Sequence, residues 1–504
     1  PVTAQSDLAQ SLTWGILYKI KTNPGEPELY ELNEDIVRWL LGSENFSPAV
    51  NHMVISVHKH TPLSSWPINY AVDSLRKCAK DHHHRLIIAG APGSGRKTLA
   101  RCAADRTGQD ILFIDISRLN DLDAETILKI RRAALLQDKL VAWCGSDASA
   151  RNLINRSGPP VGDIFIEEQH HPSKSVRGIT ETIIRMPDLS ISERKQLLQQ
   201  MLPVVRTWDQ DDFQSFAAQH TVTVGDIRQI ADADVQSIDQ VYAHMNGGSY
   251  DELDSLAERL NSEFTEDDLV LPEHTSKILN DIYFEAKTRG LFWEDRKNRR
   301  LFPQGRGLLT LFTGSPGTGK TMAAQVLANR LRLQLYRIDL STVVSKYVGE
   351  TSKNLEKVIQ GAHGLNVILF FDEADALFGK RTEISDAHDR FANTDTGFLL
   401  QAIEQYDGIA ILASNKKGNI DPAFIRRLRY VVEFPKPDAT LRQKIWDKLL
   451  TELLPAENRD ELDPVVSGIS KQLSLTGAQI KYAILSAIFL AKQDRASVNA
   501  THLL

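Results

Sequence analysis

A duplicated alternation of strands and helices is the feature that most constrains how this chain can fold. From Leu86, apolar runs such as ILFIDIS and LVAWCG alternate with helical patterns, and the same order returns from Leu308 in LLTLFTG, QLYRIDLS and VILFFDEAD. Apolar strands separated by helices predict a parallel sheet with helices on both faces. The two copies therefore predict an α/β chain with two five-stranded parallel sheets.

Each copy continues into a strand, a Pro-Asp turn and a helical tail, in IIRMPDLSISERKQLL and in YVVEFPKPDATLRQKIW. The repeat is too long, and occurs too few times, for a solenoid. It therefore indicates two duplicated modules, each with a small helical lid. The expected domains are an N-terminal helical or winged-helix domain, a first module with its lid, an acidic linker, a second core and its lid. Their boundaries are 1–75, 76–245, 246–270, 271–440 and 441–504.

Composition limits the class of protein and its partners. The net charge of −6 over 504 residues gives no basic excess, so we expect no nucleic-acid partner. The chain has no apolar run of about 18 residues and begins without the pattern of a signal peptide, so we expect no membrane partner. Three cysteines without metal-ligand spacing indicate a reducing compartment. We therefore expect a cytoplasmic protein.

The stretch GSPGTGKT in the second copy fits the template of a phosphate-binding loop at every position. Its glycines allow backbone N–H groups to surround phosphate oxygens, Lys320 neutralises the β- and γ-phosphates, and Thr321 ligates Mg²⁺. The predicted cofactors are ATP and Mg²⁺. The predicted cofactor-binding residues here are Gly314, Ser315, Pro316, Gly317, Thr318, Gly319, Lys320, Thr321 and Met322.

Polar residues end the next two apolar runs of the second copy. Asp372 and Glu373 follow VILFF, and Asn415 follows IAILAS. The carboxyl ends of parallel strands meet at one edge of a sheet, beside the phosphate loop. We expect Asp372 to hold Mg²⁺, Glu373 to act as the general base on water, and the Asn415 amide to face the same water.

The first copy departs from this template in GAPGSGRKT, residues 90–98. Arg96 replaces the phosphate lysine and Lys97 the Mg²⁺ hydroxyl, unless the loop holds one extra residue and Thr98 serves instead. Cys144 and Gly145 stand where the other copy has its acidic pair. We expect no hydrolysis there, and two roles stay open: a packing or docking platform, which we favour, or nucleotide binding without Mg²⁺.

These motifs resemble the AAA branch of the AAA+ ATPases. The resemblance rests on GSPGTGKT, FFDEAD, Asn415, DPAFIRRLR and TGAQI, is specific over residues 270–504, and is degenerate over residues 80–245. It implies hexameric rings with ATP between neighbouring subunits. By this resemblance, Arg426 and Arg429 are arginine fingers, and Gly477 and Ala478 lie near the adenine. Many relatives outside this branch carry a sensor arginine where this chain has Gln479, so the resemblance does not imply a sensor residue in the lid.

The same resemblance implies pore loops that grip a polypeptide client of unknown identity. SKYVGET places Lys346, Tyr347 and Val348 at the pore position, where an aromatic ring can hold any sequence through apolar contact. KRTEISDAHDR, after the acidic pair, is either a solvated loop or a second pore-facing loop.

Longer stretches, such as DEADALFGKR and HDRFANTD, resemble tandem AAA ATPases encoded with bacterial extracellular contractile injection systems. This implies a role in assembly or cargo loading of such a particle, with its components as partners. The main hypothesis is a ring-forming ATPase that remodels or threads proteins. The alternatives are a scaffold whose assembly depends on ATP binding, and a DNA-handling motor.

Overall fold

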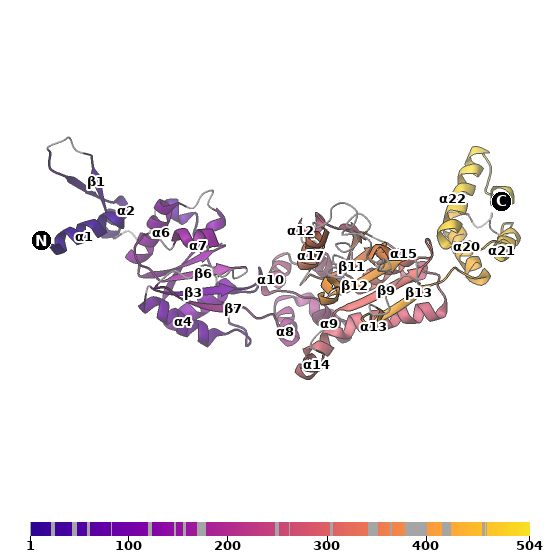
Figure 1. Cartoon of the computed structure of the whole chain (residues 1–504), viewed down its shortest axis with the longest axis horizontal. Coiled ribbons are helices and arrows are strands. Elements are labelled where there is room, and N and C mark those ends of the chain that lie inside the picture. Colours follow the sequence, from indigo (N-terminus) through magenta and orange to yellow (C-terminus); the bar gives the residue numbers. More distant parts are fainter. Residues whose placement is uncertain are drawn as a thin grey trace, which may run out of the picture. The chain divides into compact units, whose positions relative to one another are not determined.

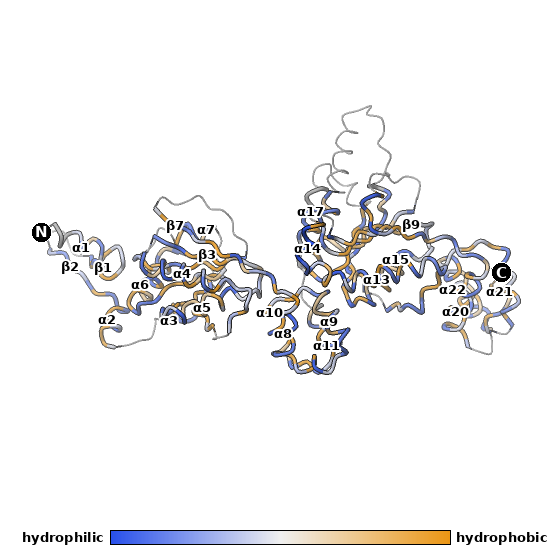
Figure 2. The backbone as a smooth tube through the Cα atoms, turned by 90° about the horizontal axis from the view of Figure 1, so that it is seen from below, coloured by the Kyte–Doolittle hydropathy of each residue, from blue (hydrophilic) through white to orange (hydrophobic). Residues whose placement is uncertain are grey.

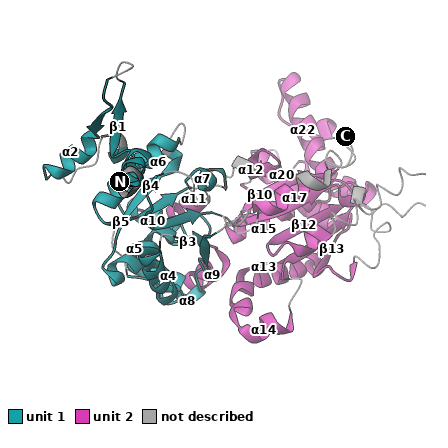
Figure 3. Cartoon of the chain, turned by 60° about the vertical axis from the view of Figure 1, so that its left-hand side comes forward, with its two compact units in different colours: residues 1–202, 222–233 teal, residues 203–221, 234–504 magenta. Residues whose placement is uncertain are grey.

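In the computed structural model, the protein forms two compact units (Figure 3). Unit 1 comprises residues 1–202 and 222–233, and unit 2 comprises residues 203–221 and 234–504, so the chain passes between the units three times. The structure describes residues 2–21, 26–42, 48–57, 61–81, 83–118, 123–145, 148–154, 158–168, 178–246, 251–261, 263–302, 306–340, 351–362, 365–377, 401–415, 425–455, 459 and 461–503.

Unit 1 contains the predicted parallel five-stranded sheet. Its strand order is β4-β5-β6-β3-β7, and its strands are β3 (His84–Ala89), β4 (Asp110–Asp115), β5 (Lys139–Cys144), β6 (Asp163–Glu167) and β7 (Thr180–Arg185). Alternate residues of β3 enter two different cores, because successive side chains of a strand point to opposite faces. Leu86 packs with helices α4 (Ile68–Lys80) and α5 (Arg96–Thr107), and Ile87 packs with α6 (Ala124–Leu136).

Unit 2 contains a mixed six-stranded sheet, one strand more than expected. The strands are β8 (Glu258–Leu260), β9 (Leu308–Gly314), β10 (Gln334–Asp339), β11 (Val367–Asp372), β12 (Ile409–Ser414) and β13 (Tyr430–Phe434). In the order β13-β9-β12-β11-β10-β8, the first five strands are parallel and repeat the order of the first sheet. The expectation of a purely parallel sheet is wrong here, because β8 from the expected linker pairs antiparallel with the edge of β10.

Helices cover the sheet of unit 2 and form its lid. Apolar residues of β9 pack on both faces, and the hydropathy-coloured backbone is orange along β3 and β9 (Figure 2). The helices of the core are α12 (Asp251–Asp254), α13 (Glu273–Glu294), α14 (Arg296–Leu301), α15 (Lys320–Leu331), α17 (Thr351–Ala362) and the short η4 (Ala374–Leu377). The lid has its own apolar core and consists of α20 (Ala439–Leu453), α21 (Asp463–Gln472), α22 (Gly477–Gln493) and α23 (Ala500–Leu503).

The helical tail of the first copy is divided between the units. Unit 1 keeps α8 (Ile191–Met201) and α10 (Val224–Asp232), whereas η2 (Pro203–Thr207), α9 (Gln210–Gln219) and α11 (Ile238–Asn246) belong to unit 2. Helix α7 (Ala148–Ile154) lies earlier in the chain, between β5 and β6. Helix α9 packs directly on α13, because a Cβ at Gly290 would lie 2.0 Å from the Ala218 carbonyl oxygen. The Gln219 side chain also donates to the Leu331 carbonyl at 2.9 Å. These helices therefore form part of the packing of the second module.

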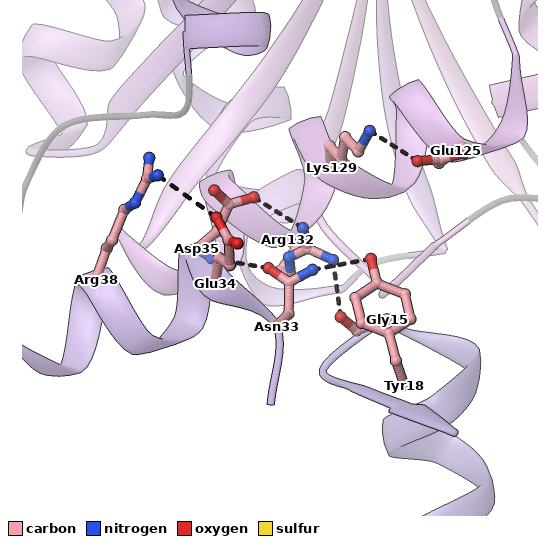
Figure 4. A network of polar contacts seen from close by, with 9 residues as sticks. All are labelled: Gly15, Tyr18, Asn33, Glu34, Asp35, Arg38, Glu125, Lys129 and Arg132. Carbon is pink, nitrogen blue, oxygen red and sulfur yellow. Dashed lines mark hydrogen bonds and ion pairs between the residues drawn. The ribbon is translucent and has the colours of Figure 1, made fainter. Parts of the chain in front are cut away.

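The N-terminal segment consists of short elements anchored on the first module. It contains α1 (Val2–Thr13), the antiparallel pair β1 (Leu17–Ile20) and β2 (Leu29–Leu32), α2 (Glu34–Leu40) and α3 (Pro48–Asn51) (Figure 1). Arg132 of α6 is buried and donates to the Gly15 carbonyl at 2.8 Å and to the Asp35 carboxylate at 2.9 Å (Figure 4). Within the described ranges, every helix is too short or too polar to cross a bilayer.

Candidate active site

The glycine-rich loop of the second module joins the end of β9 to the start of α15. Gly317 and Gly319 have φ values of +77° and +99°, in the left-handed region that glycine adopts without steric penalty. Gly319 caps α15, so the free N–H groups of its first turn face the loop. A helix N-terminus behind such a loop is suited to binding phosphate.

Lys320, the predicted phosphate-binding lysine, is the first residue of α15 and is buried. Its Nζ donates to the carbonyls of Gly314 at 2.7 Å and Ser315 at 3.3 Å, and to Oδ1 of Asn415 at 2.9 Å. Burial lowers the pKa of Lys320 from its ordinary value, although two nearby carboxylates oppose the change. The ammonium therefore joins the ends of β9 and β12 through neutral oxygen atoms.

The predicted acidic pair lies at the end of β11, which is the neighbour of β12 in the sheet. Asp372 Oδ1 accepts the Glu373 N–H at 3.0 Å, and its Oδ2 lies 3.0 Å from the guanidinium of Arg337, a residue that the sequence analysis did not identify. Glu373 is exposed and has a φ of +51°, which costs a residue with a side chain about 1–3 kcal/mol. Such strain is concentrated at functional sites.

Asp375 is a further residue of this cluster that the sequence analysis did not identify. Its carboxylate accepts the Ser414 hydroxyl at 2.5 Å and the Asn415 N–H at 2.9 Å. These bonds fix the end of β12, which carries the side chain that meets Lys320. The only sequence signal was a third acidic residue after the strand, and its partner depends on the strand order of the sheet.

The two predicted finger arginines differ in their surroundings. Arg426 is exposed. The Nε of Arg429 lies 3.0 Å from both carboxylate oxygens of Glu285 on α13, and the same carboxylate accepts the Tyr430 hydroxyl at 2.7 Å. Arg429 is still 64% exposed, so this contact leaves most of its surface accessible.

The start of α22 in the lid lies against the phosphate loop. The Thr476 side chain and Gln479 form a capping box, which fixes the first turn of the helix. The Ala478 N–H donates to the Gly317 carbonyl at 3.2 Å, and a Cβ at Gly477 would lie 3.6 Å from the same oxygen. The structure therefore brings the two predicted lid residues to the loop.

Residues 310–436 match the family described as "ATPase family associated with various cellular activities (AAA)". This segment is an AAA ATPase domain. It contains Lys320, the acidic pair, Asn415 and the two predicted finger arginines. The matched segment begins within β9 and ends just after β13, so the family likeness coincides with the parallel part of the second sheet.

Curated relatives match parts of the chain. An uncharacterized AAA family ATPase of Sinorhizobium fredii is 33% identical over 187 residues, 36% of this chain and 54% of the relative. Cell division protein C of Sulfolobus acidocaldarius is 31% identical over 225 residues, 41% of this chain and 59% of the relative. A proteasome-associated ATPase of Kribbella flavida is 36% identical over 173 residues, 30% of each chain. The chain thus spans less than two thirds of these relatives.

The predicted pore residues Lys346, Tyr347 and Val348 lie outside the described residues, as does the charged segment after the AAA domain's acidic pair. Their assignment remains a prediction from the sequence. Helix α17, which begins at Thr351, follows the predicted pore loop.

The loop of the first module has the same backbone form as that of the AAA domain. Gly95 caps α5 with a φ of +90°, and α5 begins at Arg96 as α15 begins at Lys320. The loop therefore has no extra residue, and Lys97 takes the position of Thr321. This register argues against the alternative in which an extra loop residue lets Thr98 supply the Mg²⁺ hydroxyl.

Strand register shows which residues of the first module correspond to the acidic pair Asp372 and Glu373 of the AAA domain. Cys144 pairs with the last residue of β4 as Asp372 pairs with the last residue of β10. Gly145 follows with a φ of +78°, so it repeats the left-handed backbone of Glu373 without a carboxylate. Burial raises the pKa of the Cys144 thiol to about 12, so this side chain stays neutral. At the two described positions that correspond to Asp372 and Glu373, the first module therefore has no carboxylate.

Residues 64–66 contact both helix α8 and the glycine-rich loop of the first module. The Ser64 hydroxyl and the Ser65 N–H donate to Glu193 Oε1 of α8 at 3.1 and 2.9 Å. The buried Trp66 ring covers Gly95, where a Cβ would lie 2.4 Å from the ring. Protein contacts therefore hold α8 to the core of this module.

Proposed function

We propose that this protein is an ATP-hydrolysing, ring-forming machine that remodels or threads protein clients. The observation that carries the proposal is the cluster at the carboxyl ends of β9, β11 and β12, where Lys320 meets Asn415 beside the Asp372–Glu373 pair. Relatives named as a proteasome-associated ATPase and as cell division protein C support a role in handling protein assemblies.

In the proposed mechanism, Lys320 exchanges its carbonyl and amide partners for the β- and γ-phosphates of ATP. Thr321 and Asp372 supply a hydroxyl and a carboxylate, and these hard oxygen donors fit Mg²⁺, which usually takes one or two side chains together with phosphates. Bound Mg²⁺ would neutralise charge on the phosphates. Glu373 takes a proton from the attacking water, and the Asn415 amide orients that water.

The proposed assembly is a homohexamer with each site completed by Arg426 and Arg429 of a neighbouring subunit. Guanidinium groups stay charged and bind phosphate oxygens in pairs, so they stabilise the charge of the transition state. The resemblance to ATPases of contractile injection systems supports particle assembly or cargo loading as the task, with the client unidentified. The first module, which lacks the catalytic groups, serves as the platform.

Replacing Tyr347 by Ala tests the threading part of the proposal. We expect basal ATP hydrolysis to stay within about threefold of the parent, whereas unfolding or transport of the client is lost. Each aromatic contact stabilises the bound polypeptide by about 0.5–1.5 kcal/mol in addition to the free energy gained from burying its surface. ATP hydrolysis is measured by phosphate release. Unfolding of the client is measured by the loss of fluorescence of a folded fluorescent protein that is fused to it. Full client work by the Tyr347→Ala variant would favour the scaffold alternative.

Nucleotide stoichiometry tests the assignment of the two modules. We expect one ATP bound per chain, because Arg96 and Lys97 stand where the second loop has Lys320 and Thr321, and the Trp66 ring packs against Gly95 of the first loop. Isothermal titration calorimetry of the parent is compared with the Lys320→Ala variant, which should bind none. Residual binding by Lys320→Ala that disappears on Arg96→Ala would instead assign a nucleotide to the first module.

A further inference from the structure

The metal carboxylate of the AAA domain already has a cationic partner in the protein. Arg337 projects from β10 with its NH2 3.0 Å from Asp372 Oδ2, and its NH1 lies 3.6 Å from Glu258 of β8. The Asp372 side chain is 19% exposed and the Arg337 side chain 37%, so solvent screens the pair only in part. Arg337 thus lies between a carboxylate of the site and a carboxylate of the segment before the AAA domain.

Strand register explains why these side chains meet. Asp339 of β10 is opposite Asp372 of β11, so Arg337, two residues earlier, lies on the same face of the sheet. On its other side, Arg337 is directly opposite Glu258 in the antiparallel pair of β10 and β8. Three neighbouring strands therefore place an anion, a cation and an anion in a row.

We propose that Arg337 is a positioning residue that competes with Mg²⁺ for Asp372, and that Glu258 sets the strength of this competition. The inference rests on the proposed ATPase function. A guanidinium on Asp372 orients the carboxylate when no metal is bound, but it opposes the approach of a second cation. Glu258 draws the guanidinium in the opposite direction and so weakens its hold on Asp372.

The position of Glu258 makes this contact responsive to the preceding chain. The segment pairs with β10 from Leu335 to Arg337, and two side chains of β10 also contact it: the Tyr336 hydroxyl donates to Asp254 of α12 at 2.7 Å, and Arg337 faces Glu258. The neighbouring Leu253 is buried in the core of the sheet. A displacement of β8 would therefore separate Glu258 from Arg337.

The test measures the Mg²⁺ concentration at half-maximal binding of a fluorescent ADP analogue by the full chain. We expect Arg337→Met to lower this midpoint at least threefold, because the competing charge is gone. Glu258→Gln should raise it at least threefold, because Arg337 then has one carboxylate partner fewer. The double variant should match Arg337→Met within twofold, and Arg337→Lys, which keeps the charge, should stay within twofold of the parent.

A matched pair controls for loss of any surface ion pair. Arg330 lies 3.1 Å from Glu266 in the same unit, and Arg330→Met and Glu266→Gln should leave the Mg²⁺ midpoint unchanged. An unchanged Mg²⁺ midpoint in Arg337→Met would overturn this inference but leave the proposed function standing. Shifts of the Mg²⁺ midpoint with the same sign in Arg337→Met and Glu258→Gln would have the same consequence. A parent protein that binds no nucleotide with Mg²⁺ would overturn the proposed function as well.

Discussion

Replacing Glu373 by Gln is expected to lower the rate of ATP hydrolysis at least about 10²-fold while ATP binding is kept. Glutamine has the shape of glutamate but cannot accept the proton of the attacking water. The Glu373 side chain is exposed at the end of β11, and its backbone is held in the left-handed region beside Asp372. The substitution therefore removes the base with little change in geometry.

Two measurements on the same protein separate binding from chemistry. Phosphate release gives the turnover, and a fluorescent ATP analogue gives the Kd, which should change less than threefold in Glu373→Gln. Lys320→Ala should lose binding, because its ammonium is the proposed partner of the phosphates. Glu168→Gln is a matched control, since Glu168 follows β6 in the first module as Asn415 follows β12, and turnover should be unchanged. Parent-like turnover by Glu373→Gln would exclude Glu373 as the base.

Replacing Arg426 or Arg429 by Ala is expected to lower turnover at least about 10³-fold, the scale of an arginine finger. The isolated chain shows why the effect should depend on assembly, since Arg426 is exposed and Arg429 is paired with Glu285 of its own chain. In a ring, the same charges would meet the phosphates of the neighbouring subunit. Turnover per chain should therefore rise with protein concentration.

Mixing two inactive variants tests whether the finger acts between subunits. Arg429→Ala subunits keep an intact phosphate loop, and Lys320→Ala subunits keep an intact finger, so mixed rings contain some complete sites. Activity should reappear on mixing and reach its maximum at comparable amounts of the two. Mixed rings that form, as seen by mass photometry of tagged subunits, but stay inactive would contradict the assignment. Glu285→Gln should change turnover less than threefold, since it alters the resting contacts of Arg429 and Tyr430 within one chain and leaves the finger guanidinium in place.

Local patterns were sufficient to predict the parts of the site that depend on neighbouring residues in the sequence. Glycine spacing predicted the loop and the start of α15, and apolar runs ending in polar residues predicted that Asn415 and the acidic pair would end strands at the same edge of the sheet. The meeting of Lys320 with Asn415 follows from parallel strands ending at one edge of the sheet. The contact between Ala478 of the lid and Gly317 of the loop involves a residue of TGAQI, the motif by which the resemblance to the AAA branch placed Gly477 and Ala478 near the adenine.

Contacts set by strand register or by distant segments could not be read from the sequence. Strand β8 has three residues within a polar stretch, too short for an apolar period to show, so its contact with Arg337 was missed. The cover of Trp66 on Gly95 and the pair of Glu285 with Arg429 join residues that carry no shared motif. Each depends on which elements become neighbours in space.

The division of the first helical tail between the units decides where the polypeptide can be cut. A fragment starting at residue 271, at the expected domain boundary, would lack α9 and α11 and would expose the surface of α13 at Gly290. It would also lack the side chain of Asp239, which lies 3.0 Å from Arg332, and the ring of Tyr242 beneath the same guanidinium. The smallest folded piece that keeps these contacts should therefore begin near Pro203, and it would also include α10, which belongs to unit 1 in the full chain. Limited proteolysis should release that piece rather than the shorter one.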